Sequence, residues 1–330
     1  MTIPHLFWLS FAAIFLVVTA IDIFATTHRH GKAGLKTALF WTSIWVSIAL
    51  VYGLAIYLWH PQGRDLAPLF IAGYLTEYSL SVDNLFVFIM IFSLMGVQEF
   101  QQPKLIKLGI LLSIFLRVLF ILFGIALITR FHWLLYAFGA LLIWTACKML
   151  FAEEGDQVDP KQNLLYRLAS RWLPLDPDMN TTRLMTRAQG ALRITPLFLV
   201  FLVIGSTDVL FAIDSIPAIM GISTDPFVVI TSNVFAVLGL VSLFFAIRGV
   251  MNLFRFLKHG VSLVLFFIGA KMLAGLHAPT EHFFKTHTWV SLLVIGATLA
   301  FSIILSVVIA EEVEHEKQRT GPDSAPDRPE

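Results

Sequence analysis

The sequence predicts an all-α, polytopic membrane protein with about nine transmembrane helices, and three observations support this fold class. The chain has 330 residues, of which 57% are hydrophobic and 14% are charged, and its mean hydropathy is +0.80. Soluble domains are usually about 45–50% apolar and about 25% charged. The apolar residues are divided into separate blocks, and each block has the roughly twenty residues that a helix needs to cross a bilayer.

The apolar blocks define the predicted spans in order along the chain. They cover residues 6–24, 37–58, 69–96, 105–128, 133–151, 195–220, 227–248, 256–276 and 288–310. The first block begins without a basic region and has no small-residue cleavage site. We therefore expect it to be a retained span and not a cleaved signal peptide.

The distribution of basic residues predicts the orientation. Most of the 23 Lys and Arg residues fall in the first, third, fifth and seventh connections and in the tail, whereas the alternate connections carry only Arg64, Arg130 and Lys285. Basic connections stay in the cytoplasm. We therefore expect a bacterial cytoplasmic (inner) membrane protein with its N-terminus outside and its C-terminus in the cytoplasm, as an odd number of spans requires.

The fifth connection, residues 152–194, is the only long one. Its stretch from Leu164 to Leu173 carries Arg167, Arg171 and Trp172. This pattern is compatible with a helix that lies on the anionic inner leaflet, and equally with a solvated linker. The tail, residues 317–330, is rich in Pro, Asp and Glu, and we expect it to be disordered in the cytoplasm.

Two pairs of acidic residues lie inside predicted spans with the same spacing of six. Glu77 and Asp83 form the first pair, and Asp208 and Asp214 form the second. A charged side chain at the centre of a bilayer costs about 2.5–3.5 kcal/mol on insertion scales, so charged residues in spans usually mark ion or proton pathways. The repetition of the pair makes a functional origin the better interpretation.

The long connection separates two halves that resemble each other. Spans three to five and six to eight share the acidic pairs, and Lys148-Met-Leu corresponds to Lys271-Met-Leu. Because each half has three spans, the second must enter the membrane from the opposite side, which is the inverted-repeat architecture of many secondary transporters. The predicted division is 1–66 (two N-terminal spans and a basic loop), 67–151 (first repeat), 152–194 (connecting loop), 195–276 (second repeat), 277–316 (final span) and 317–330 (tail).

The spacing of six separates the two acids of a pair by about 120° around a helix and by about 9 Å along it. The acids of one intact helix therefore cannot hold one ion together. Either the helices are interrupted, for which Pro217 offers a position, or each acid meets its counterpart on the other helix. The alternative without a function is that the acids only neutralise Arg117 and the two lysines.

The available ligand atoms favour a hard cation. The chain has a single cysteine, Cys147, which excludes an internal disulfide and a Cys-rich metal site. Oxygen donors without sulfur suit Mn²⁺, Mg²⁺ or Ca²⁺ better than Zn²⁺ or Cu⁺. No permanent cofactor is expected, and the net charge of +1 gives no reason to expect a nucleic acid partner.

These motifs resemble the TerC/Alx family of membrane proteins. The resemblance rests on Glu77-x-Ser-Leu-x-Val-Asp83-Asn84-Leu-Phe-Val, on Arg117 and on Asp208-Val-x-Phe-Ala-x-Asp214-Ser215-Ile-Pro217-Ala. Thr231-Ser-Asn233-x-Phe-Ala and Ala20-Ile-Asp22 also match, so the resemblance extends over nearly the whole chain. It implies manganese export, protection from metal stress and a kinship with cation exporters built from inverted three-helix repeats.

Two positions depart from the family pattern. Gly205 stands where family members carry a Glu, and Val241 stands where they carry an Arg. The loss of one acid and one base together is consistent with the loss of a compensating pair. A different cation preference or a loss of transport is equally compatible with it.

The leading hypothesis is an exporter of Mn²⁺ or a similar divalent cation, coupled to proton entry and serving metal homeostasis. The predicted metal ligands are Glu77, Asp83, Asn84, Asp208 and Asp214, with Arg117, Ser215, Asn233 and Asp22 in support. An enzyme is not expected, because the Gly-x-Gly-Asp element of membrane aspartyl proteases is absent. The rival hypothesis is an assembly or metallation factor that uses loop 152–194 to hold a partner and transports nothing itself.

Overall fold

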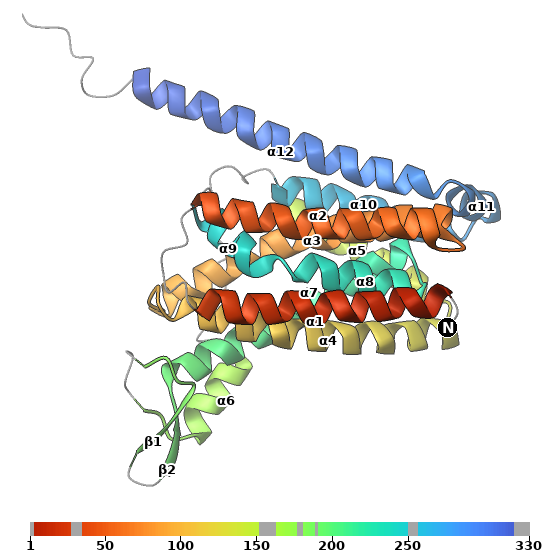
Figure 1. The fold of residues 1–330 in the computed structure, drawn as a ribbon. Helices are drawn as coiled ribbons and strands as arrows, with labels where there is room; N and C mark the ends of the chain where they lie inside the picture. The colour runs from red at the N-terminus through yellow and green to blue at the C-terminus, as the bar shows by residue number, and fades with distance from the viewer. Residues whose placement is uncertain are drawn as a thin grey trace, which may run out of the picture.

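The computed structural model describes residues 3–27, 35–151, 163–176, 181–188, 191–249 and 257–319. The described chain is a bundle of long helices with one small lobe at its side (Figure 1). The helices are α1 (Ile3–Thr27), α2 (Leu35–Trp59), α3 (Gly63–Leu94), α4 (Gln102–Arg130), α5 (Leu134–Phe151), α6 (Leu164–Trp172), α7 (Pro196–Ile222), α8 (Pro226–Val237), α9 (Leu240–Gly249), α10 (Leu257–Ala274), α11 (Ala278–Thr286) and α12 (Thr288–Arg319). The strands are β1 (Met185–Ala188) and β2 (Ala191–Ile194).

The all-α, multi-pass class is confirmed, but the number of nine spans is not. Seven helices of the described chain are long and apolar enough to cross a membrane: α1, α2, α3, α4, α5, α7 and α12. The number rises to eight when α8 and α9 count as one span, because this pair is bent by 44°. The predicted span 256–276 corresponds to α10, whose 18 residues include Lys258, His259 and Lys271 and which is not among these helices.

Several helix ends follow from local chemistry. Pro103, Pro196 and Pro226 stand in the first turns of α4, α7 and α8, where the missing N–H would have no helical partner. Asp225 caps α8, since its Oδ1 accepts hydrogen bonds from the N–H groups of Phe227 (2.9 Å) and Val228 (3.2 Å). Gly96, with φ of 67°, follows α3 and permits the turn toward α4.

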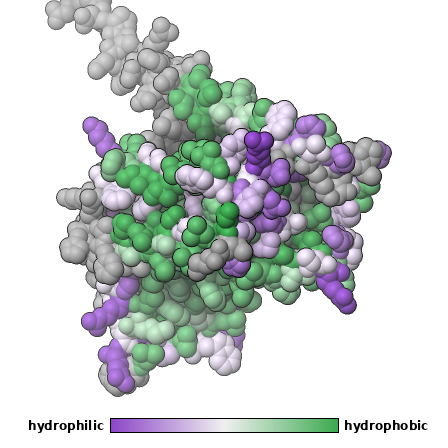
Figure 2. All heavy atoms as spheres, turned by 45° about the vertical axis from the view of Figure 1, so that its right-hand side comes forward, coloured by the Kyte–Doolittle hydropathy of each residue, from purple (hydrophilic) through white to green (hydrophobic). Residues whose placement is uncertain are grey.

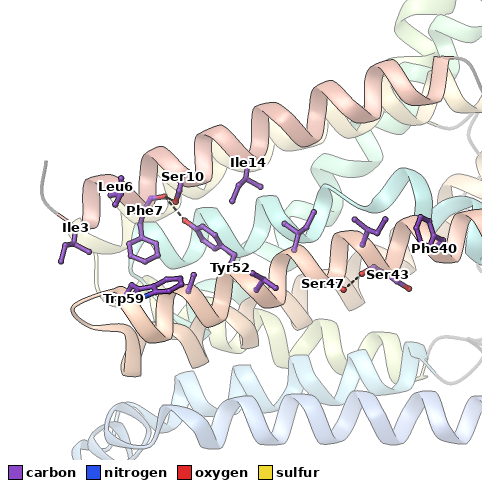
Figure 3. Close-up of a pocket in the computed structure, with 14 residues that line it drawn as sticks. Ile3, Leu6, Phe7, Ser10, Ile14, Phe40, Ser43, Ser47, Tyr52 and Trp59 are labelled. Carbon is purple, nitrogen blue, oxygen red and sulfur yellow. Dashed lines mark hydrogen bonds between the residues drawn. The ribbon is translucent and has the colours of Figure 1, made fainter.

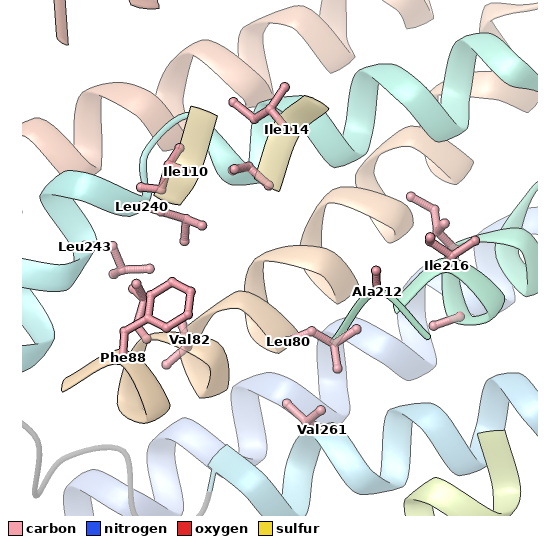
Figure 4. Close-up of a cluster of buried hydrophobic side chains, with 14 of the residues drawn as sticks. Leu80, Val82, Phe88, Ile110, Ile114, Ala212, Ile216, Leu240, Leu243 and Val261 are labelled. Atoms are coloured by element: carbon pink, nitrogen blue, oxygen red, sulfur yellow. The ribbon is translucent and has the colours of Figure 1, made fainter. Parts of the chain in front are cut away.

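The core lies where α3, α4, α7, α8, α9 and α10 meet. α3 packs against α7 and α8, while α4 packs against α7, and α5 against α10. Side chains such as Leu80, Ile114 and Ile216 point into this space from three different helices (Figure 4). Glycines bring helices close together: a Cβ at Gly269 of α10 would lie 2.7 Å from the carbonyl oxygen of Gly139 on α5.

The outer surface is apolar. Large side chains such as Val51, Phe123 and Phe301 are about two-thirds exposed, and hydrophobic residues cover much of the face seen in Figure 2. A surface of this kind is stable next to lipid chains and unstable in water. It agrees with a protein whose bundle is surrounded by a bilayer.

A groove of about 870 Å³ runs between α1 and α2 (Figure 3). Its lining is mostly apolar, and within it the Tyr52 hydroxyl donates a hydrogen bond to the carbonyl oxygen of Phe7, 2.9 Å away. All the residues that line it belong to these two helices. The groove is therefore separate from the acidic residues of α3 and α7.

The segment after α5 forms a small lobe of α6 and a two-stranded antiparallel sheet, in which Met185 pairs with Ile194 and Ala188 with Ala191. The stretch expected to form either a surface helix or a solvated linker is helical from Leu164 to Trp172. The sheet was not expected. Asn163 caps α6 by accepting hydrogen bonds from the N–H groups of Leu165 and Tyr166.

Candidate functional site

Arg117 of α4 is buried between two carboxylates that come from different helices. It forms ion pairs with Glu77 of α3 and with Asp208 of α7, where its Nη2 lies 3.6 Å from Asp208 Oδ1. The side chains of Arg117 and Glu77 are each 1% exposed. A charge this deeply buried is tolerated only when it is paired, so the three side chains depend on one another.

Two neutral side chains complete the surroundings of the guanidinium. Arg117 Nε donates a hydrogen bond to Ser113 Oγ at 3.1 Å. With the Asn84 amide turned so that both of its atoms find a partner, its oxygen accepts a hydrogen bond from Arg117 Nη2 at 3.2 Å and its nitrogen donates one to the carbonyl oxygen of Leu80 at 3.1 Å. Ser81 Oγ donates to Glu77 Oε1 at 3.4 Å.

Helical periodicity explains why these residues meet. Glu77, Ser81 and Asn84 are separated by four and three residues, so they occupy one face of α3. Ser113 and Arg117 are four residues apart on α4 and also share a face. The contact then requires only that these two faces and the Asp208 side of α7 turn toward each other.

Several buried polar atoms of α3, α7 and α8 have no hydrogen-bond partner among the described residues. These atoms are Thr76 Oγ1, Glu77 Oε2, Asp208 Oδ2, Ser215 Oγ and both amide atoms of Asn233. Burial of an unsatisfied polar group costs about 1–3 kcal/mol. Atoms of this kind commonly serve a ligand, an ion or water.

The structure brings together four of the residues predicted from the sequence: Glu77, Asn84, Arg117 and Asp208. Ser215 and Asn233 are buried, at 2% and 1% exposure, with their polar atoms unsatisfied. The side chains of Asp22, Asp83 and Asp214 lie outside the described residues. Among the residues described, no three His, Cys, Asp or Glu side chains converge as a metal site.

Sequence reasoning missed Ser113 and Thr76. Ser113 could have been found, because it lies one helical turn before the only arginine in its span.

The suggested break near Pro217 is wrong: α7 continues through it from Pro196 to Ile222, and the bend lies instead between α8 and α9. A proline inside a membrane helix is tolerated when neighbouring groups satisfy the freed carbonyl.

The two lysines do not pair with the described acids. Lys148 Nζ lies 5.7 Å from the centre of the Trp144 ring, and Lys271 Nζ lies 5.7 Å from the centre of the Phe284 ring. Both contacts have the geometry of cation–π interactions. Arg117 is thus the basic residue that neutralises Glu77 and Asp208.

Comparison with known proteins decides the family. The profile of the integral membrane protein TerC family matches residues 62–314, which include α3 to α11 and most of α12. The chain belongs to the TerC family. The match confirms the resemblance inferred from the acidic motifs, and it places Glu77, Arg117 and Asp208 within the TerC region.

Relatives extend the TerC match to the N-terminal helices. The chain is 40% identical over 322 residues to an uncharacterized membrane protein of Myxococcus xanthus, covering 98% of this chain and 96% of the relative. It is 38% identical over 323 residues to an Escherichia coli K12 protein with the provisional name membrane-bound redox modulator Alx, covering 96% and 98%. It is 37% identical over 275 residues to the chloroplast thylakoid membrane protein TERC of Arabidopsis thaliana, covering 82% and 69%. No solved structure matches the chain.

The two departures from the TerC pattern both face α4. A Cβ at Gly205 would lie 2.8 Å from Leu112 Cδ2. Val241 is buried and lines a cavity of about 30 Å³ together with Lys107 and Ile110. An acid at position 205 and a base at position 241 would therefore both lie against α4, and the idea that they were lost as a pair stays a prediction.

Proposed function

We propose that this TerC protein exports a divalent cation, Mn²⁺ by preference, from the cytoplasm through its intramembrane carboxylates. The observation that carries the proposal is the shared Arg117. Two acids from separate helices converge on one buried positive charge, and each keeps a second oxygen without a partner. A cation that reaches this point would find oxygen ligands already dehydrated.

Arg117 would act as a tethered substitute for the cation. When no metal is bound, it neutralises Glu77 and Asp208 and keeps them from repelling each other. When metal arrives, the guanidinium and the ion compete for the same oxygens. Competition of this kind holds affinity down and promotes release, which a transporter needs as much as binding.

The donor set supports a hard cation. Glu77 and Asp208 supply carboxylate oxygens, and the Ser215 hydroxyl and the Asn233 amide supply further buried oxygens on α7 and α8. Oxygen ligands of this kind suit Mn²⁺, Mg²⁺ and Ca²⁺. Asp83 and Asp214, which occupy the other two positions of the repeated motif, are proposed as further ligands along the path.

Proton entry would supply the driving force. Moving two positive charges outward against 100 mV costs about 4.6 kcal/mol, at about 2.3 kcal/mol per charge. Carboxylates bind protons and metal ions in competition. Protons that enter as metal leaves would therefore return the site to its unloaded state.

The packing of the helices supports the proposed inverted repeat. Under the correspondence of α3 with α7, of α4 with α8 and α9, and of α5 with α10, each contact should recur after exchange of the halves. α3 packs on α8 and α7 on α4, while α5 packs on α10. Such symmetry suits alternating access. The correspondence of α10 with α5 makes α10 a ninth span, and an odd number of spans allows the N-terminus outside and the C-terminus in the cytoplasm that the basic connections predict.

The name of the Alx relatives suggests a redox role, which the sequence limits. The chain has one cysteine, so it cannot cycle between an intramolecular dithiol and a disulfide. A bound redox group would be required instead. Cation movement needs no such group.

Uptake of Mn²⁺ into inside-out proteoliposomes, with a fluorescent indicator in the lumen, tests the proposal. Glu77→Gln and Asp208→Asn should reduce the flux to background. Asp65→Asn, which changes an exposed acid in the first turn of the same helix as Glu77, should leave it intact. Wild-type flux in both site variants would refute the proposal. The same vesicles with Mg²⁺, Ca²⁺ and Zn²⁺ rank the cations, and a lumenal pH dye reports proton exchange.

A further inference from the structure

The helix α6 exposes apolar side chains on one side. Leu164, Leu168 and Trp172 are 68%, 46% and 77% exposed, and they recur every four residues. That spacing places them along one face of a helix. A helix of nine residues cannot hold such a face in water by itself, so something must cover it.

The opposite side of α6 is firmly attached to α7. Ala169 is buried with Ile194 and Leu199, and Tyr166 packs against the same cluster. Asn163, which caps the helix, also donates a hydrogen bond from Nδ2 to Ser206 Oγ at 2.7 Å. The exposed leucines are therefore not available for packing on α7, and they point away from it.

The position of α6 along α7 indicates the depth of the exposed face. Ser206 lies ten residues into α7, which corresponds to about 15 Å along the axis. The other end of the lobe reaches the start of α7, where Leu175 bridges to Ile194. α6 thus lies beside the first half of a candidate membrane span (Figure 1).

The charged side chains of the lobe are mostly basic. Arg167 and Arg171 on α6 and Arg183 and Arg187 at the hairpin are exposed. Residues 163–195 contain five Arg and only two Asp. Basic side chains beside exposed Leu and Trp are the composition of helices that lie at an anionic lipid surface.

From these observations we propose that α6 is an interfacial helix bound to anionic phospholipid. Leu164, Leu168 and Trp172 insert among the upper acyl chains, and Arg167 and Arg171 bind the phosphates above them. The hairpin adds further arginines at the same surface. This proposal is independent of cation transport, because it rests on a different part of the chain.

Fluorescence quenching in lipid nanodiscs tests the proposal. A bimane label is placed on Leu168→Cys in a Cys147→Ser background, and the nanodiscs contain phosphatidylglycerol with brominated acyl chains. Phe301→Cys on α12, where the native side chain is 67% exposed, gives the matched lipid-facing control. Both labels should be quenched.

The role of charge is tested with Arg167→Gln together with Arg171→Gln, or with phosphatidylcholine that carries the same brominated acyl chains as the only lipid. Either change should lower quenching of the label at position 168 to about half or less, since each basic residue near an anionic surface contributes to attraction. The control label should not respond, which also shows that the variant is folded. A label at position 168 that is unquenched in anionic nanodiscs, or that becomes shielded only when a soluble protein is added, would overturn the proposal.

Discussion

Arg117 Nε and Ser113 Oγ lie 3.1 Å apart, one helical turn from each other on α4. This contact leaves the two terminal nitrogens of the guanidinium directed toward other helices, where they reach Glu77 and Asp208. One serine thus fixes the side chain from which two helices obtain their counter-charge.

Replacement of Arg117 by Gln should destabilise the metal-free protein by about 3–5 kcal/mol, because two buried carboxylates lose their partner. If a divalent cation uses the same oxygens, Mn²⁺ should raise the Tm of Arg117→Gln more than that of the wild type. Thermal unfolding in detergent with and without Mn²⁺ measures both effects. Arg130→Gln, at the exposed end of α4, is the control and should behave as wild type. Equal Mn²⁺ shifts in Arg117→Gln and wild type would contradict the competition.

Replacement of Ser113 by Ala should cost about 1.5–3 kcal/mol, the usual range for a hydrogen bond to a charged group. The loss should largely vanish when Arg117 is already Gln, because the two residues then have no contact to lose. A double-mutant cycle on unfolding free energies measures this coupling. Ser43→Ala removes a hydroxyl that makes a similar bond within α2 at an exposed position, and it should change stability by a few tenths of a kcal/mol. Additive effects of Ser113→Ala and Arg117→Gln would show that the hydrogen bond contributes nothing.

Much of the fold could be predicted because the bilayer imposes simple rules on sequence. A span needs about twenty apolar residues, and charges within it need a reason. These rules identified most of the helices and singled out Glu77 and Asp208. They could not predict that both acids share Arg117, because that depends on how α3, α4 and α7 are rotated about their axes.

The bend between α8 and α9 was missed for a related reason. The residues on either side of it carry no charge and are mostly apolar, so hydropathy shows one continuous block. Gly239 lies at this bend, and a Cβ there would be 3.1 Å from Trp45 Cβ. The bend is thus associated with a tertiary contact that no local pattern records.

The hairpin of the lobe was missed because arginines interrupt the alternation of apolar and polar residues by which strands are recognised.

The close contact between α5 and α10 predicts that an alanine at Gly269 of α10 destabilises the protein. An alanine at Gly296 of α12, which has no close neighbour, should not. A Cβ at Gly269 would meet Gly139 O at 2.7 Å and Ile143 Cγ1 at 2.9 Å. Because one of these is backbone, Gly269→Ala should push the helices apart and cost about 1–3 kcal/mol. At Gly296 of α12 nothing lies within 4 Å, so Gly296→Ala should be neutral or stabilise by up to about 1 kcal/mol. Comparable destabilisation at the two positions, measured as Tm in the same detergent, would contradict the close packing.

His60 and Asp225 predict how stability responds to acid at one end of the bundle. Burial lowers the pKa of His60, between α2 and α3, below its ordinary 6.5, and the negative charge of Asp225 opposes that shift. The ring stacks on Phe227 with centroids 5.8 Å apart, and its Nδ1 accepts a hydrogen bond from the Gln62 N–H at 3.2 Å. Neutral imidazole therefore fits this position better than imidazolium.

Since the folded state binds the proton less readily than the unfolded state, stability should be complete above pH 6.5. It should decline as the pH falls through the lowered pKa of His60. His60→Gln should remove that part of the pH dependence. Asp225→Asn keeps a residue that caps helices well but removes the opposing charge, so it should lower the pKa of His60 further and deepen the loss in acid. Melting curves between pH 8 and pH 5 distinguish these outcomes. A decline that persists unchanged in His60→Gln would assign the acid sensitivity to another group.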